Sequence, residues 1–81
     1  MVTLTFLTRA DCHLCETARE AIAEAVVGRD VSVDEIDIDS DDDLSGQYGW
    51  DVPVVLLNGR QHSFHRVDTD RLSKALAALG A

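Results

Sequence analysis

The feature that most constrains the fold is a nearly continuous apolar run at residues 52–57, which reads Val-Pro-Val-Val-Leu-Leu. A strand with one face in water alternates apolar and polar side chains, so an unbroken run is typical of a strand buried on both faces. Asn58-Gly59 follows at once, and this dipeptide is the strongest short signal for a hairpin with a type I′ turn. The sequence therefore predicts a central strand that turns back into an antiparallel neighbour over 60–65.

Helical and strand periodicities predict the elements that surround this hairpin. In the second strand the apolar phase shifts between Val33 and Ile36, so we expect an irregularity or a late start there. The apolar stripes of the first and last helices include Leu14 and Leu79, and we expect Phe64 in the core. We expect strands at 2–7, 31–38, 52–57 and 60–65, and helices at 12–27, 40–48 and 69–79.

This order of elements defines the predicted architecture. It is β-α-β-(α)-β-β-α, an α/β arrangement with a four-stranded mixed sheet flanked by helices. The chain has 81 residues and shows no repeat or linker, so residues 1–81 are expected to form a single domain. A chain of this size buries about 60% of the surface that its unfolded form exposes, which allows one modest core.

The net charge of −8 limits the partners that the chain can bind. Binding to nucleic acid or to an anionic membrane needs clustered Lys and Arg, so we expect neither partner. The acidic run at 37–43 is interpreted as a solvated loop, because it lacks the Gly and Glu of a calcium-binding loop. Residues 1–7 lack the basic region and cleavage site of a signal peptide, so we expect a cytoplasmic protein. We also expect the protein to act as a monomer.

The two cysteines, Cys12 and Cys15, stand three positions apart, directly after a predicted strand and at the start of a predicted helix. The unpaired N–H groups and the positive dipole end of a helix N-terminus lower the pKa of a thiol from about 8.5. We therefore predict that Cys12 is the nucleophile and that Cys15 attacks the mixed disulfide formed at Cys12. Arg9 and a protonated His13 would stabilise the Cys12 thiolate, whereas Asp11 would oppose it.

Two other interpretations of the cysteine pair stay open at this point. The cysteines could be inert and buried, or they could bind zinc together with His62 and His65. Residues 16–61 separate the two halves of such a site, far more than in a zinc finger. Side chains alternate along a strand, so the two histidines would point to opposite faces of the predicted strand at 60–65. We therefore expect no metal site.

Two motifs resemble those of a known family. Residues 8–15 read Thr-Arg-Ala-Asp-Cys-His-Leu-Cys, which is similar to the Thr-Arg-x-x-Cys-His-Leu-Cys signature of the small glutaredoxin-like proteins of bacteria. Residues 48–54 read Tyr-Gly-Trp-Asp-Val-Pro-Val and resemble the segment that carries the cis-proline in thioredoxin-fold proteins. The resemblance covers essentially the whole chain. It implies a thioredoxin/glutaredoxin-like fold with a cis bond between Val52 and Pro53.

The resemblance also implies a function, that of a thiol–disulfide oxidoreductase acting on a disulfide-containing protein or on a glutathione mixed disulfide. In this fold the backbone before the cis-proline binds the substrate chain, a role that falls to Val52 and Pro53 beside Cys12. Trp50 either packs under the active-site loop or contacts the substrate at the rim.

No bound cofactor is implied by the resemblance. Glutaredoxins hold glutathione with a Gly-Gly pair and an acidic residue after the last hairpin. Residues 63–68 of this chain read Ser-Phe-His-Arg-Val-Asp and contain no such pair, which leaves glutathione open as a co-substrate. The alternative function is a thioredoxin-fold binding module that is redox-inactive, or that carries an iron–sulfur cluster on Cys12 with external glutathione.

Overall fold

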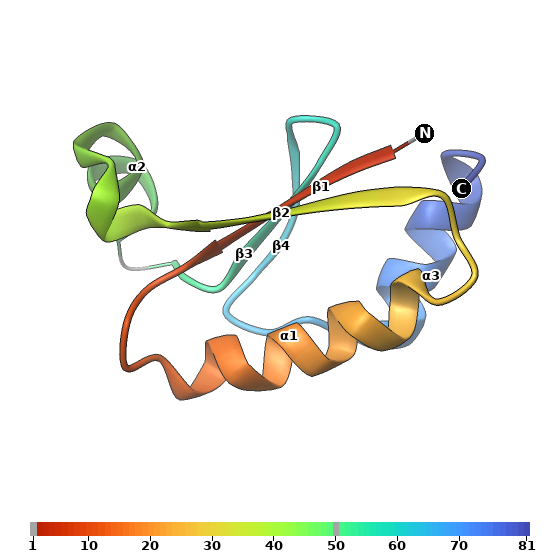
Figure 1. Ribbon diagram of the computed structural model, residues 1–81, viewed down its shortest axis with the longest axis horizontal. Coiled ribbons are helices and arrows are strands. Elements are labelled where there is room, and N and C mark those ends of the chain that lie inside the picture. Colours follow the sequence, from red (N-terminus) through yellow and green to blue (C-terminus); the bar gives the residue numbers. More distant parts are fainter. Residues whose placement is uncertain (1, 50) are drawn as a thin grey trace.

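The computed structural model describes residues 2–49 and 51–81 (Figure 1). Its order of elements is the predicted β-α-β-(α)-β-β-α. No helix in these two ranges is long and apolar enough to cross a membrane. The elements are β1 (Val2–Thr8), α1 (His13–Val26), β2 (Val31–Asp37), the 3₁₀ turn η1 (Ile38–Ser40), α2 (Asp42–Tyr48), β3 (Val54–Leu57), β4 (Arg60–Phe64) and α3 (Thr69–Ala78).

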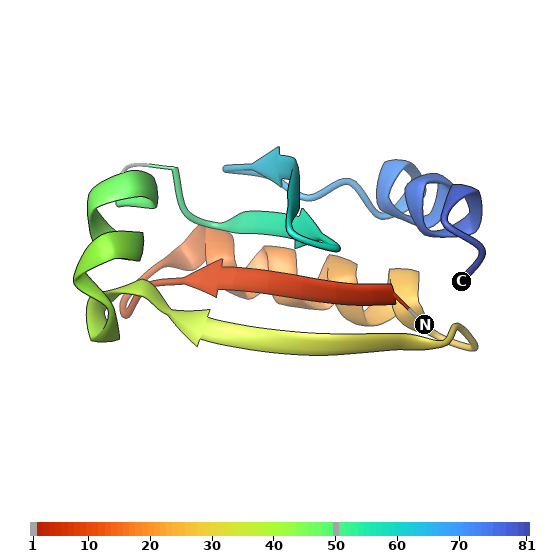
Figure 2. The ribbon, with the colours of Figure 1, turned by 90° about the horizontal axis from the view of Figure 1, so that it is seen from above.

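In the described part of the chain, four strands form one mixed sheet in the order β2-β1-β3-β4, as Figure 2 shows from above. β1 pairs in parallel with β2 and antiparallel with β3, and β3 pairs antiparallel with β4. β3 therefore lies in the interior of the sheet, and β2 and β4 form its edges. The strand begins at Val54, later than the predicted start at Val52, and contains the last four residues of the apolar run. The predicted hairpin is confirmed, because Asn58 and Gly59 both have positive φ values, 51° and 83°, as a type I′ turn requires.

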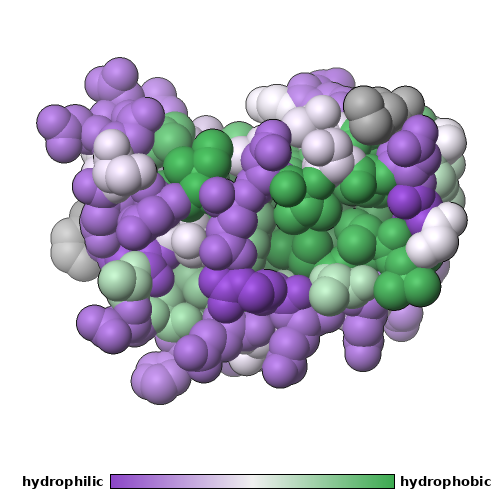
Figure 3. Space-filling model, in the orientation of Figure 1, coloured by the Kyte–Doolittle hydropathy of each residue, from purple (hydrophilic) through white to green (hydrophobic). Residues whose placement is uncertain are grey.

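The helices cover the two faces of the sheet unequally. α1 and α3 lie along one face, whereas α2 stands at one end of the other face (Figure 1). Figure 3 shows the β2 edge in the same orientation, with hydrophilic side chains over α2 and an apolar area toward the opposite end. The larger core joins Leu4 and Phe6 of β1 to Ile22 of α1 and Leu76 of α3. A smaller core under α2 contains Leu7, Ile38 and Val54.

β2 differs from its prediction. The strand begins at Val31 and pairs with β1 in unbroken register as far as Asp37, so the irregularity or late start expected there is wrong. Val31 packs against the larger core, whereas Ile36 packs against the smaller core on the opposite face. Val33 is exposed. Each face of the sheet has its own core, so one regular strand can bury apolar side chains on both of its faces.

Three apolar side chains that were expected in the core are exposed instead: Leu14 at 45%, Phe64 at 51% and Leu79 at 47%. The buried stripe of α1 passes through Cys15 rather than Leu14, because the cysteine sulfur fills the inward position of the first turn. Phe64 ends the edge strand β4, and Leu79 follows the last residue of α3. These three places lie at the ends of elements, where few neighbours cover a side chain.

Substitution in α3 tests this packing. Leu76 is fully buried at 0% exposure against α1 and β1, so Leu76→Ala should lower the free energy of unfolding by about 2–5 kcal/mol, measured by urea denaturation. Leu79→Ala in the same segment is the matched control and should cost less than about 1 kcal/mol, since its side chain is half exposed. Equal losses in the two variants would contradict this placement of α3.

Candidate functional site

The candidate site is built on the N-terminus of α1. Cys12 is the N-cap residue, and Cys15 lies in the first turn of the helix. The two residues form a disulfide, and their Cα atoms are 5.2 Å apart. Cys15 is 2% exposed and belongs to the larger core, whereas Cys12 is half-buried at the surface of that core. One sulfur of the pair is therefore accessible and the other is enclosed.

The backbone around Cys12 favours negative charge on its sulfur. The N–H of Cys15 donates a hydrogen bond to Cys12 Sγ across 3.2 Å. The first N–H groups of a helix have no partner within the helix, and the dipole places partial positive charge at the same end. The sulfur of Cys12 thus occupies the place where a helix stabilises an anion.

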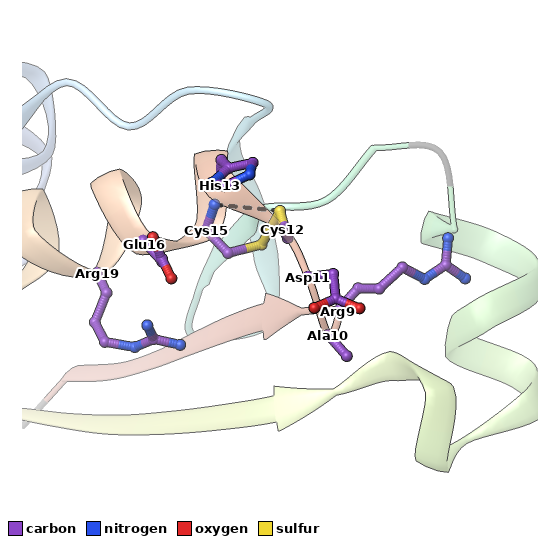
Figure 4. A pocket seen from close by; sticks show the side chains of 8 residues that line it. All are labelled: Arg9, Ala10, Asp11, Cys12, His13, Cys15, Glu16 and Arg19. Atoms are coloured by element: carbon purple, nitrogen blue, oxygen red, sulfur yellow. Dashed lines mark hydrogen bonds between the residues drawn. A yellow bond between two sulfur atoms is a disulfide. The ribbon is translucent and has the colours of Figure 1, made fainter.

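A cavity of about 320 Å³ lies beside the disulfide. Its side chains include basic groups, acidic groups and the imidazole of His13, which is exposed on the first turn of α1 (Figure 4). The effect of His13 on the Cys12 thiol stays a prediction. The lining residues are Arg9, Ala10, Asp11, Cys12, His13, Cys15, Glu16 and Arg19.

Arg9 lies at the rim of this cavity, but its guanidinium is engaged elsewhere. Its Nε donates to Asp39 Oδ1 across 3.1 Å, and its Nη1 donates to the carbonyl oxygen of Gly49 across 2.8 Å. In Figure 4 the side chain extends toward α2, away from the two sulfur atoms. Arg9 therefore joins the loop before Cys12 to η1 and to the end of α2. The predicted influence of Arg9 on the pKa of the Cys12 thiol stays a prediction.

Arg19 also has a partner that is distant in the sequence. Its guanidinium forms two hydrogen bonds with the Glu35 carboxylate of β2, at 2.8 and 3.1 Å. This pairing raises the pKa of the Arg19 guanidinium further, chiefly through the hydrogen bond and then through the charge of Glu35. The guanidinium also lies over the ring of Phe6, 5.8 Å from its centroid. Arg19 thus lines the cavity and links α1 to the sheet through Glu35 of β2 and the ring of Phe6.

The segment that was predicted to face the disulfide has the expected backbone. The bond between Val52 and Pro53 is cis, which confirms the prediction. Pro53 is buried, and Val52 is half-buried and packs against both cores. Trp50, the third predicted substrate contact, lies outside the described residues. The substrate-binding roles of all three residues stay predictions.

A contact that the sequence did not predict fixes the loop after β4. The N–H of His65 donates to the carbonyl oxygens of Asp51 and Pro53, across 3.1 and 2.8 Å. His65 has a positive φ of 64° and lies outside β4. The alternation along a strand that was expected for His62 and His65 therefore does not apply to His65. Within residues 2–49 and 51–81, no three His, Cys, Asp or Glu side chains are placed to hold a metal ion.

Comparison with known proteins assigns the chain to a family. Residues 3–77 match the glutaredoxin-like domain family. An uncharacterized protein of Mycobacterium tuberculosis is 37% identical over 76 residues, which cover 88% of this chain and 78% of that protein. The chain belongs to the glutaredoxin-like domain family, as the motif at 8–15 predicted.

Solved structures agree with this assignment. The X-ray structure of a protein from X. campestris has a TM-score of 0.77 and 39% identity, covering 93% of this chain and 96% of that chain. Chloroplastic thioredoxin z has a TM-score of 0.80 at 13% identity, covering 99% of this chain and 79% of its own, and shows the fold alone. The predicted thioredoxin/glutaredoxin-like fold is therefore confirmed.

Two glycines, Gly46 in α2 and Gly49 at its C-terminal end, test how closely the backbone packs there. A Cβ atom at Gly49 would lie 2.6 Å from the backbone oxygen of Ser45, so Gly49→Ala should lower the free energy of unfolding by about 1–3 kcal/mol. A Cβ atom at Gly46 would meet nothing within 4 Å, so Gly46→Ala should raise that free energy by about 0.5–1 kcal/mol. Urea denaturation of both variants measures the difference. A stabilising effect of Gly49→Ala would contradict the close approach.

His62 makes the stability depend on pH. Burial lowers the pKa of His62, and the charge of Arg71 lowers it further. The unfolded chain therefore binds more protons at this residue than the folded chain, and the free energy of unfolding decreases as the pH falls through about 6.5. We expect His62→Gln to show a smaller decrease than the wild type between about pH 7.5 and 5.5, measured by urea titration. An unchanged decrease would show that His62 is not the group responsible.

Proposed function

We propose that this protein is a dithiol–disulfide oxidoreductase, with Cys12 as the attacking thiolate and Cys15 as the resolving thiol. The observation that carries the proposal is the asymmetry of the pair at the start of α1. Cys12 Sγ is at the surface and accepts the N–H of Cys15, whereas Cys15 is enclosed in the core at disulfide distance from it. Such surroundings are those in which a thiol pKa falls below about 8.5.

The reaction proceeds in two exchanges. The Cys12 thiolate attacks one sulfur of the substrate disulfide, forming a mixed disulfide and releasing the other substrate sulfur as a thiolate, which takes up a proton. Cys15 then loses its proton and attacks Cys12 Sγ. The second substrate sulfur leaves and takes up a proton. The substrate gains two electrons and two protons, and the protein is left with the Cys12–Cys15 disulfide.

The packing of Cys15 supports its role as the resolving thiol. A bulky substrate cannot reach a side chain that is 2% exposed, but Cys12 lies on the same turn of the helix. Once Cys12 carries the substrate, Cys15 is the nearby thiol that can attack it. The enclosed position of Cys15 therefore confines the first exchange to Cys12. Its closeness to Cys12 makes the second exchange intramolecular.

The substrate is proposed to be a disulfide-containing protein or a glutathione mixed disulfide. The half-buried Val52, next to the buried Pro53, is proposed to hydrogen-bond the substrate chain through its backbone, with Trp50 at the rim. The protein is expected to need no resident cofactor and to act as a monomer in the cytoplasm. A reducing compartment of that kind would return Cys12 and Cys15 to the dithiol after each turnover.

Serine variants of the two cysteines test the proposal. Reduction of a model protein disulfide, followed with a recycling thiol present, should be lost in Cys12→Ser, because no nucleophile remains at the surface. Cys15→Ser should retain the first exchange and accumulate a mixed disulfide with the substrate, visible as a reductant-sensitive band on a non-reducing gel. Leu79→Ala serves as a control variant with an exposed substitution.

Two results would overturn these assignments. A Cys12→Ser protein that reduced the model disulfide at the wild-type rate would show that Cys12 is not the nucleophile. A Cys15→Ser protein with full turnover and no trapped species would show that Cys15 does not resolve the intermediate. Circular dichroism of both variants separates a loss of chemistry from a loss of folding.

A further inference from the structure

Charge is distributed unevenly over this acidic protein. Of its 15 carboxylate side chains, all but two precede residue 52. The edge strand β4, the loop after it and α3 carry most of the cations. Residues 60–74 contain Arg60, Arg66, Arg71 and Lys74, together with only Asp68 and Asp70.

The cations in the first part of the chain are already bound within the protein. Arg9 and Arg19 form the ion pairs described above, and Arg29 donates to two backbone carbonyl oxygens. Among the described residues, the guanidinium groups of Arg66 and Arg71 form no ion pair and no side-chain hydrogen bond. These two charges are therefore available to a carboxylate from another molecule.

A groove in two adjoining parts contains these two arginines. Its first part, about 310 Å³, lies between α1 and the loop after β4, and is lined by Leu14, Arg66 and Val67 among others. Its second part, about 490 Å³, continues past Phe64 to Arg71 between β4 and α3. Arg66 and Val67 line both parts. Leu14 stands between the two cysteines in the sequence, so the first part of the groove lies on the helix turn that carries the reactive pair.

The groove combines apolar and basic side chains. Leu14 and Phe64, at 45% and 51% exposure, leave apolar surface open at its two parts. The loop between β4 and α3 is held against the Pro53 segment through the N–H of His65, so its course is fixed before any partner arrives. Asp68 also lines the second part, where its carboxylate accepts the backbone N–H of Arg71 as the cap of α3. Its negative charge offsets part of the basic charge, and the two arginines leave that part of the groove with a positive balance.

We propose that this groove binds an acidic polypeptide segment next to the reactive cysteine of the substrate protein. Carboxylates of that segment pair with Arg66 and Arg71, and its apolar side chains contact Leu14 and Phe64. The inference rests on the proposed function and names the class of substrate. The Debye length is about 8 Å at physiological ionic strength, so a carboxylate in the groove interacts with these arginines more strongly than with the acidic residues of β2 and α2.

The preference for acidic or for basic substrates distinguishes binding in the groove from an effect of the net charge. A net charge of −8 alone would favour basic substrates over acidic ones. The groove predicts the opposite order at physiological salt. Three cysteine peptides with Glu, Gln or Lys beside the cysteine, each as a mixed disulfide with a chromophoric thiol, therefore separate the two effects. The measurement is the second-order rate of chromophore release by the reduced protein.

We expect the Glu peptide to react about three- to tenfold faster than the Gln peptide, in line with two exposed ion pairs. The double variant Arg66→Gln/Arg71→Gln should lose this ratio. Arg60→Gln/Lys74→Gln is the matched control, because it removes the same amount of charge from positions in β4 and α3 outside the groove, and it should keep the ratio. Equal rates for the three peptides, a preference for Lys, or loss of the ratio in the control would overturn the inference while leaving the oxidoreductase proposal intact.

A binding measurement decides the question even if no peptide is reduced. The oxidised protein is titrated by NMR with a Glu peptide in which Ser replaces Cys. Shifts at Leu14, Arg66, Val67 and Arg71 that are absent with the Lys peptide would support the groove. The same shifts with inorganic phosphate at equal concentration would instead indicate a general anion site, and no shifts would overturn the inference. Release of chromophore no faster than by Cys12→Ser would refute the oxidoreductase proposal itself.

Discussion

The packing of α1 on the sheet is the constraint on which the site depends. The buried stripe of the helix begins with Cys15 and continues through Ala18 and Ile22, so half of the reactive pair is also part of the core. This burial fixes the rotation of the helix and leaves Cys12 at the surface. The helix N-terminus, its free N–H groups and the accessible sulfur are thereby brought to one place by apolar packing rather than by polar contacts.

Much of the fold could be predicted because its signals are local. The apolar run that ends in β3 and the Asn58-Gly59 turn each act within a few residues of the structure they specify. The spacing of Cys12 and Cys15 is also a local signal, because one turn of the helix sets the distance between the two residues. Local propensity and the final structure agree at all of these positions.

The remaining features depend on contacts between distant segments. Asp39 and Gly49 lie 30 and 40 residues from Arg9, and no pattern in the sequence points to either of them. The sequence places Glu16 and Glu20 within one turn of Arg19, yet Arg19 pairs with Glu35 on the neighbouring strand. Leu14 was expected inside because it lies at helical spacing from Ala18 and Ala21, but the buried stripe of α1 runs through Cys15, Ala18, Ile22 and Ala25 and leaves Leu14 outside.

Acidic and basic side chains lie on different parts of the molecule, and this separation of charge affects how the protein meets a partner in solution. A molecule with acidic side chains toward β2 and α2 and basic ones toward β4 and α3 has an electric dipole between these two parts. An approaching partner of uneven charge exerts a torque on such a dipole, which turns the molecule before any contact forms. The rate of productive collisions is then set partly by orientation, and it becomes sensitive to ionic strength even where the final contacts are apolar.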